Sequence, residues 1–162
     1  MNSKGYVLIV DDEQILRESL SEWLKEDGYQ VNAVSNGMDA LKVIAQSPPD
    51  VAVVDIKMPG MDGVTLLKKI KEQNPEIPVI MMTAFATVEN AVQSMKDGAY
   101  DFLTKPFPPE KLSNMIKHIL EHKKLKEENI RLQRERKHIL QIAFSALVSF
   151  IVLAFVLYFV FR

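Results

Sequence analysis

One segment, VAVVDIKMPGMDG at residues 51–63, is compatible with few structures. It opens with four consecutive apolar residues, Val51 to Val54, and a strand this apolar is typically covered on both faces. Asp55 ends the apolar run, and the turn-forming pairs Pro59-Gly60 and Asp62-Gly63 take the chain away from it. We therefore expect Asp55 at the carboxyl end of a central parallel strand, where open α/β sheets bind their ligands.

Further segments of strand length alternate with helical patterns along the chain. These strands are predicted at Tyr6 to Val10, Val31 to Val34, Pro78 to Met82 and Tyr100 to Leu103. Between them, apolar residues recur at helical spacing, including Val88, Ala91, Val92 and Met95 in the fourth helix. Short alternating units predict an α/β fold, a doubly wound five-stranded parallel sheet with helices on both faces. No G-x-G-x-x-G follows the first strand, so the fingerprint of dinucleotide binding is missing.

The C-terminal third begins with a fifth helix, predicted to start at Pro109 and to complete a first domain at residues 1–120. Residues 121–138 form a charged helical linker. Within and just after this linker, heptad spacing relates Leu125, Asn129, Leu132, Arg136 and Ile139. Such a seam with one Asn is typical of a two-stranded coiled coil, hence of a homodimer. A solvated single helix remains the alternative.

Residues 139–161 contain no charged side chain. At about 1.5 Å per residue the segment is roughly 34 Å long, enough for a hydrocarbon core of about 30 Å. The alternative, a buried core helix, lacks partners because the predicted sheet is already covered. We therefore predict a single transmembrane helix. Lysines and arginines precede this helix and only Arg162 follows it, and positively charged flanks normally stay in the cytoplasm. We therefore predict a protein of the cell (inner) membrane with residues 1–138 in the cytoplasm.

Composition excludes several other classes of function. The formal net charge is −1, so no electrostatic attraction to nucleic acid is expected. The absence of cysteine excludes disulfides, thiolate metal sites and cysteine nucleophiles. The first apolar run is too short for a signal peptide.

No recognition helix or Walker A motif is found, and we expect the chain to pass from the fifth helix into the membrane without an output domain.

Polar residues follow four of the predicted strands: Asp11-Asp12, Asp55, Thr83 and Lys105. The carboxyl ends of parallel strands meet at one edge of a sheet, so these groups can converge. Neighbouring carboxylates favour a hard cation such as Mg²⁺, which takes oxygen ligands and can orient a phosphoryl group for transfer to Asp55. An Asp-Asp pair is often only a helix cap, but co-occurrence at successive strand ends favours a functional site.

The motifs VDDE, DIKMPGMDG, MMTA and LTKPF identify a resemblance that covers residues 5 to about 120. The segment resembles a response-regulator receiver domain of two-component signalling, in particular receivers that precede nitrogen-regulation-type activators. The resemblance implies the flavodoxin-like strand order 2-1-3-4-5. It also implies phosphorylation of Asp55 by a sensor histidine kinase or a histidine phosphotransfer protein.

The resemblance further implies a role for each matched position. The expected Mg²⁺ ligands are Asp12 directly, Asp11 largely through water, Asp55, and the backbone carbonyl of Lys57. The expected partners of the phosphoryl group are the switch hydroxyl of Thr83 and the phosphate-binding Lys105. Phe102 matches the switch aromatic.

These expectations combine into a membrane-anchored response regulator that signals to a protein target, still unknown, through the face around the fourth and fifth helices. A phosphorelay shuttle or phosphate sink is one alternative, and a membrane scaffold whose oligomerisation the receiver controls is another. We expect no enzymatic activity other than self-catalysed phosphotransfer and slow self-dephosphorylation. A phosphatase of the dehalogenase type would need an aspartate at the position of Lys57.

Overall fold

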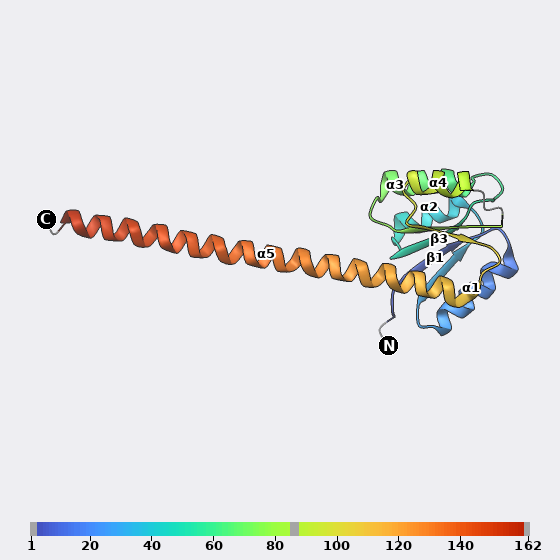
Figure 1. The fold of residues 1–162 in the computed structure, drawn as a ribbon, viewed down its shortest axis with the longest axis horizontal. Helices are drawn as coiled ribbons and strands as arrows, with labels where there is room; N and C mark the ends of the chain where they lie inside the picture. Colours follow the sequence, from blue (N-terminus) through green and yellow to red (C-terminus); the bar gives the residue numbers. More distant parts are fainter. Residues whose placement is uncertain (1–2, 85–87, 161–162) are drawn as a thin grey trace. The chain divides into compact units, whose positions relative to one another are not determined.

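The computed structural model describes residues 3–84 and 88–160, with side chains for all of these except 88–91, 143 and 146–160. Strands and helices alternate along the described chain (Figure 1). They are β1 (Tyr6–Val10), α1 (Gln14–Glu26), β2 (Gln30–Val34), α2 (Gly37–Gln46), β3 (Val51–Asp55), α3 (Gly63–Gln73), β4 (Val79–Thr83), α4 (Val88–Lys96), β5 (Asp101–Thr104) and α5 (Pro109–Val160).

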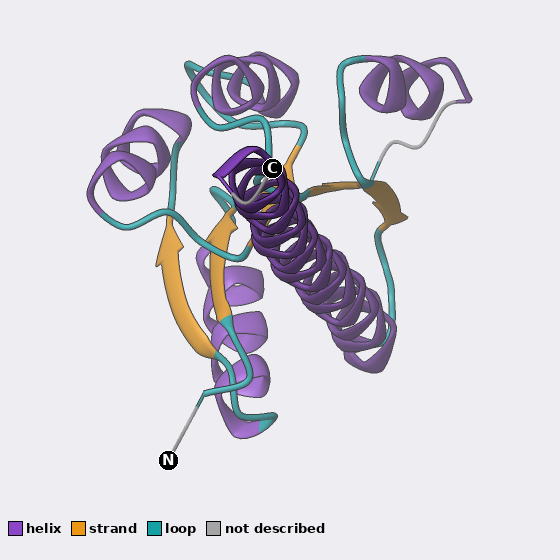
Figure 2. Cartoon of the chain, turned by 90° about the vertical axis from the view of Figure 1, so that its left-hand side faces the viewer, coloured by secondary structure: helices purple, strands orange, loops and turns teal. Residues whose placement is uncertain are grey.

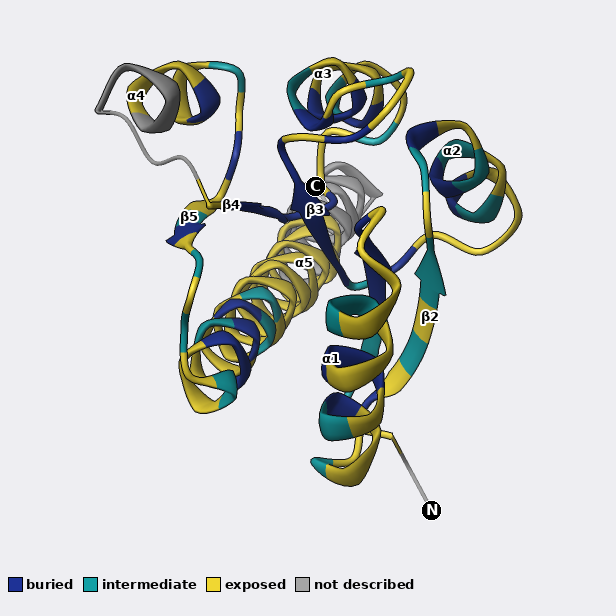
Figure 3. Cartoon of the chain, turned by 90° about the vertical axis from the view of Figure 1, so that its right-hand side faces the viewer, coloured by how far each residue is buried: buried dark blue, intermediate teal, exposed yellow. Residues whose placement is uncertain are grey.

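The strands form one sheet in the order β2-β1-β3-β4-β5, and every neighbouring pair is parallel. This confirms the predicted doubly wound sheet and its strand order. Helices lie on both sides of the sheet, with α2, α3 and α4 on one side and α1 on the other (Figure 2, Figure 3). The ends of each strand lie within one residue of the predicted ones. Pro78, for example, precedes β4, and its carbonyl accepts a hydrogen bond from the N–H of Ala52 (2.9 Å).

The core has two layers, one on each face of the sheet. Alternate residues of β3 contribute to each layer, because successive side chains of a strand point to opposite faces. Ala52 and Val54 pack with the apolar residues of α2 and α3, and Val51 and Val53 pack with those of α1 and the start of α5. All five residues of β3 are buried (Figure 3), as predicted for a central strand.

Helix α4 corrects one prediction. Its Val92 and Met95 were expected on a buried apolar face, but they are 47% and 48% exposed, whereas Ser94 is completely buried. Residues two apart point to nearly opposite sides of a helix, so burying Ser94 turns Val92 outward. The side chains of Val88 and Ala91, which belong to the same predicted face, lie outside the described residues.

Contacts divide the chain into two compact units, Met1–Leu120 and Glu121–Arg162. Helix α5 begins at Pro109, as predicted, and its backbone is helical to Val160. In the first unit, Leu112, Ile116 and Ile119 are buried against the sheet.

The predicted membrane helix at residues 139–161 consists mostly of residues whose side chains lie outside the described set. Among the residues that were described, no helix combines the length and the apolar character needed to cross a membrane.

Candidate functional site

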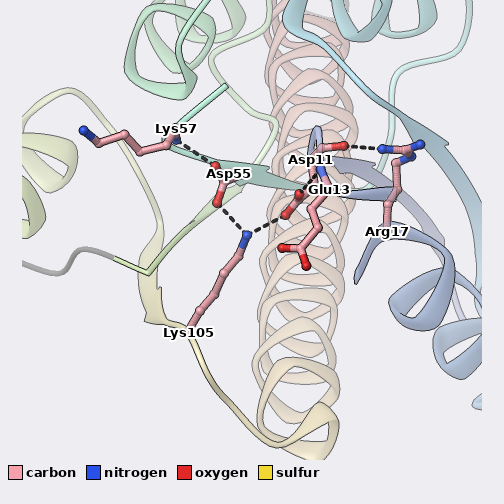
Figure 4. A network of polar contacts seen from close by, with 6 residues as sticks. All are labelled: Asp11, Glu13, Arg17, Asp55, Lys57 and Lys105. Atoms are coloured by element: carbon pink, nitrogen blue, oxygen red, sulfur yellow. Dashed lines mark hydrogen bonds and ion pairs between the residues drawn. The ribbon is translucent and has the colours of Figure 1, made fainter. Parts of the chain in front are cut away.

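Three charged side chains meet at the carboxyl edge of the sheet (Figure 4). Asp11 follows β1, Asp55 is the last residue of β3, and Lys105 follows β5. The Nζ of Lys105 lies 2.7 Å from Asp11 Oδ2 and 2.7 Å from Asp55 Oδ1, so one ammonium group bridges both carboxylates. The side chains of Asp11, Asp55 and Lys105 are only 1%, 6% and 14% exposed. The convergence predicted for these three residues is therefore found.

The backbone around Asp55 holds its carboxylate in place. The N–H of Lys57 donates a hydrogen bond to Asp55 Oδ2 (2.7 Å), leaving Oδ1 to Lys105. The N–H of Ile56 donates to the carbonyl of Met82 (2.9 Å), and the N–H of Gly63 donates to the carbonyl of Ile56 (2.9 Å). These bonds fasten the segment after β3 to both β4 and the start of α3. Asp62 caps α3 by accepting from the N–H of Thr65 (2.7 Å).

Asp11 is fixed on three sides. Its Oδ1 accepts a hydrogen bond from the N–H of Glu13 (2.9 Å), its Oδ2 contacts Lys105, and its carbonyl oxygen accepts from Arg17 Nη1 (2.7 Å). The first bond holds the turn that leads into α1. The N-cap residue of α1 is Glu13, and no side chain caps the helix, so the capping role considered for the Asp-Asp pair is not found. No sequence pattern indicated this contact of Arg17, because it depends on where the first turn of α1 lies.

Burial and charge act on the two ion-pair partners in opposite directions. Burial raises the pKa of Asp55 above its ordinary value, although the hydrogen bond from Lys105 lowers it in part. Burial alone would lower the pKa of Lys105, but its hydrogen bonds to Asp11 and Asp55 outweigh burial and raise it. Lys105 therefore keeps its positive charge at neutral pH, and the site offers a fixed cation to a phosphoryl group.

Thr83 and Phe102, the predicted switch residues, lie on the adjacent strands. Thr83 is the last residue of β4 and is 1% exposed, and its carbonyl accepts a hydrogen bond from the N–H of Lys105 (2.8 Å). Phe102 on β5 is partly buried against the core layer formed with α2 and α3. Thr83 thus fixes the loop that carries Lys105, which adds a positioning role to the hydroxyl role expected of it.

The remaining predicted ligands lie at the rim of the site. Asp12 is exposed next to the buried Asp11, and Lys57 is exposed while its backbone N–H contacts Asp55. No group of three or more acidic or histidine side chains in the described part of the chain is arranged to hold a metal ion. The two buried carboxylates nevertheless already share one cation, the Lys105 ammonium, and carboxylate oxygens are the donors that Mg²⁺ prefers. The donor set therefore fits a hard divalent ion.

A pocket of about 560 Å³ adjoins the site. Its lining includes Leu16, Leu20 and Trp23 of α1, Lys105, and Phe107 of the loop before α5. The peptide bond between Lys105 and Pro106 in that loop is cis. The pocket therefore places mostly apolar side chains beside Lys105, which sequence patterns did not reveal.

The sequence matches the response regulator receiver domain family over residues 7–117. The chain belongs to this family. As a receiver domain it accepts a phosphoryl group, and the carboxylates and lysine described above occupy the edge of the sheet where the acceptor was predicted.

Curated relatives include the regulatory protein AtoC of Escherichia coli, 38% identical over 128 residues, which cover 79% of this chain and 28% of AtoC. The DNA-binding transcriptional regulator NtrC of the same species is 39% identical over 119 residues, which cover 74% of this chain and 25% of NtrC. The chain therefore spans about a quarter of the length of these relatives.

Solved structures agree with the fold. NtrX from Brucella abortus is 35% identical with a TM-score of 0.74, and the match covers 79% of this chain and 29% of that one. The receiver domain of the Francisella response regulator 1452 is 32% identical with a TM-score of 0.71, over 74% of this chain and 98% of that one. The similarity thus concerns the receiver part of longer proteins and an isolated receiver alike.

Proposed function

We propose that this receiver is a phosphorylation switch whose acceptor is Asp55. The donor is the phosphohistidine of a sensor histidine kinase or a histidine phosphotransfer protein. An Asp55 carboxylate oxygen attacks the phosphorus, the N–P bond to histidine breaks, and an acyl phosphate forms on Asp55. The observation that supports this most directly is the bridge from Lys105 to Asp55 and Asp11, since it places a buried nucleophile beside a fixed cation.

Each residue of the site then has a defined task. The N–H of Lys57 orients the carboxylate, and Lys105 neutralises charge on the phosphoryl oxygens. When bound, Mg²⁺ neutralises further charge and aligns donor and acceptor for in-line transfer. Its proposed ligands are the carboxylates of Asp11, Asp12 and Asp55 and the carbonyl of Lys57.

The decisive test labels the full chain with a small phosphodonor, acetyl phosphate, in the presence of Mg²⁺. Asp55→Asn should abolish labelling. Asp62→Asn is the matched control, because Asp62 is an exposed cap and Asn caps helices equally well; labelling should persist. Labelling that survives in Asp55→Asn would sink the assignment of the acceptor.

The proposed output is a contact with a protein partner on the face formed by α4, β5 and the start of α5. Val92 and Met95 of α4 and Tyr100, just before β5, expose apolar surface on this face, at 47%, 48% and 45% exposed. Phosphorylation would draw the hydroxyl of Thr83 toward the acyl phosphate and let Phe102 turn inward. These movements would shift the equilibrium between two conformations of this face toward the one that binds the partner. A pull-down with phosphorylated wild type should capture a partner that Asp55→Asn does not.

The alternatives predict different outcomes. In a phosphorelay shuttle or sink, Thr83→Ala would keep both phosphorylation and signalling, whereas in a contact-based switch it would keep only phosphorylation. In a receiver-controlled scaffold, deleting residues 121–138 would abolish the response while phosphorylation survives. The NtrC relative is named as DNA-binding, but the net charge of −1 here favours a protein partner; a phosphorylation-dependent gel shift with duplex DNA would contradict this.

We also propose that residues 139–161 anchor the receiver at the cytoplasmic face of the cell membrane. The support is their lack of charge together with the basic residues that precede them. The full chain should remain in the membrane pellet after alkaline carbonate extraction, and its receiver should be cleaved by protease only from the cytoplasmic side. Release by carbonate would overturn the anchor and leave the acceptor assignment untouched.

We propose no catalytic activity beyond the phosphorylation and dephosphorylation of Asp55 itself. Lys57 stands where a phosphatase of the dehalogenase type would need a second aspartate. Multiple turnover of p-nitrophenyl phosphate by the purified chain would contradict this proposal.

A further inference from the structure

Beyond Leu120, helix α5 carries large apolar side chains that are exposed in the single chain. Leu125, Leu132 and Ile139 are 59%, 50% and 65% exposed and recur every seven residues. Asn129 and Arg136, also exposed, lie between them on the same side of the helix. We propose that residues 121–142 pair with the same segment of a second copy of this chain, as a parallel two-stranded coiled coil. This inference goes beyond the proposed function and requires neither phosphorylation nor a membrane.

The two kinds of seam position are chemically distinct. In heptad notation the d positions are apolar, at Leu125, Leu132 and Ile139, and the a positions are polar, at His122, Asn129 and Arg136. The three outward positions b, c and f are almost entirely polar, with Ile130 as their exposed apolar exception at 41%. The side of the helix that would face a partner is therefore well defined.

The separation of apolar d from polar a selects the orientation. In a parallel pair each layer faces its own copy, so Leu125 meets Leu125, Leu132 meets Leu132, and Asn129 meets an Asn with which it can exchange hydrogen bonds. In an antiparallel pair every a position faces a d position. Each leucine would then meet a polar side chain, and each buried polar group would lack a partner.

Charges that flank the seam favour the same orientation. In a parallel pair, Glu121 at position g reaches Lys126 of the second copy at position e, an attractive contact. Arg136 at position a reaches Glu135 of the second copy at position g, so its charge need not face only another arginine. Within one chain Glu135 pairs with Arg131 at 3.0 Å, with side chains 55% and 81% exposed. Such an exposed pair holds Glu135 weakly and allows the exchange.

The length of the seam sets the strength of the pairing. Three apolar layers are few for a coiled coil, so we expect a reversible dimer whose population rises with protein concentration. Because the pair is parallel, both receivers would lie at the same end of the paired segment.

Single-cysteine crosslinking of the full chain in lipid vesicles tests both pairing and orientation. The protein contains no cysteine, so one introduced thiol is the only one present. Mild oxidation with copper phenanthroline should link two copies several-fold more at L125C, L132C and I139C than at the outward positions I130C and R134C. Only a parallel pair brings all three d positions close to their own copies.

Other crosslinking patterns would overturn the proposal. An antiparallel pair would give one maximum along the helix, and unpaired or randomly colliding helices would give equal yields at all five positions. As a second readout, L132E added to L125C should lower the crosslinked fraction several-fold, whereas the matched control I130E should not. Equal effects of L132E and I130E would also contradict the seam.

Discussion

A Cβ atom on Gly63 would collide with the backbone carbonyl oxygen of Asp55 and lie 2.9 Å from its carbonyl carbon. The first residue of α3 is therefore in direct backbone contact with the end of β3, where the proposed acceptor is located. Only glycine permits this approach. The position of Asp55 thus depends on a residue that carries no functional group.

Gly63→Ala should destabilise the receiver by about 3 kcal/mol or more, because the added methyl group meets backbone and forces α3 away from β3. Urea unfolding followed by circular dichroism measures the change. Gly60→Ala is the matched control. Gly60 has φ +78° but nothing within 4 Å of an added Cβ, so only its conformation is penalised, by about 1 kcal/mol. Equal losses in the two variants would contradict the contact.

Two aspartates should respond to pH with opposite signs. The pKa of Asp55 is raised by burial, so the folded chain binds this proton more tightly than the unfolded chain, whose value is near 3.8. Stability contributed by this group falls as pH rises from 3.8 to its folded pKa, and stays lower above it. Asp55→Asn should therefore stabilise the receiver at neutral pH, with the gain disappearing in acid.

Asp27 provides the comparison. Its pKa is lowered by hydrogen bonds from Lys4 and Ser113, so it stabilises the fold above pH 3.8 and loses that effect as pH falls through its folded pKa. The side chain is 32% exposed, so Asp27→Asn should cost at most about 1 kcal/mol at neutral pH. Urea unfolding of both variants, measured between about pH 3 and about pH 7, covers the range in which carboxyl groups titrate. A change in stability of the same sign in Asp55→Asn and Asp27→Asn at neutral pH would contradict the opposite pKa shifts of the two aspartates.

Two buried serines in helices should also behave differently. Ser94 of α4 is fully buried, and its Oγ has no hydrogen-bond partner among the described residues. Ser94→Ala should stabilise the fold by about 1 kcal/mol, because an unsatisfied hydroxyl is removed. Ser113 of α5 is 8% exposed and donates to a carboxylate oxygen of Asp27. Ser113→Ala should cost about 2 kcal/mol. Thermal or urea unfolding distinguishes the two, and a loss in Ser94→Ala would show that the hydroxyl has a partner.

Removing the bridging ammonium should change the titration of the acceptor. The hydrogen bond and charge of Lys105 are the main effects that lower the pKa of Asp55, so Lys105→Met should raise that pKa further. Lys57→Met is the control, since Lys57 contacts Asp55 through its backbone N–H, which methionine retains. Carbon-13 NMR of the aspartate carboxyl groups follows the titration. An unchanged pKa in Lys105→Met would contradict the bridge.

The centre of the sheet was predictable because β1, β3 and β4 are short apolar runs, each closed by a polar residue. Val51 to Val54 indicated a strand covered on both faces, and the structure buries it on both. The orientation of α4 was not predictable in the same way. Its apolar residues are too few to determine which side faces the core, and the protein buries Ser94 in place of Val92.

The site was predictable at the level of strand ends and no further. Parallel strands bring Asp11, Asp55, Thr83 and Lys105 to one edge regardless of side-chain detail. The sequence does not reveal that Asp11 turns inward while its neighbour Asp12 stays exposed, since that depends on the turn before α1. The contact from Arg17 depends on the same turn.

The bridge between Asp11 and Lys105 joins residues 94 positions apart. A ribosome makes the chain from its N-terminus, so both carboxylates of the site emerge well before the lysine that neutralises them. Until residue 105 has been added, the nascent sheet carries two neighbouring acidic groups at its edge without their shared cation. Assembly of the acceptor site is therefore a late event in the synthesis of the receiver, and a chain arrested after β4 contains Asp55 but not a working site.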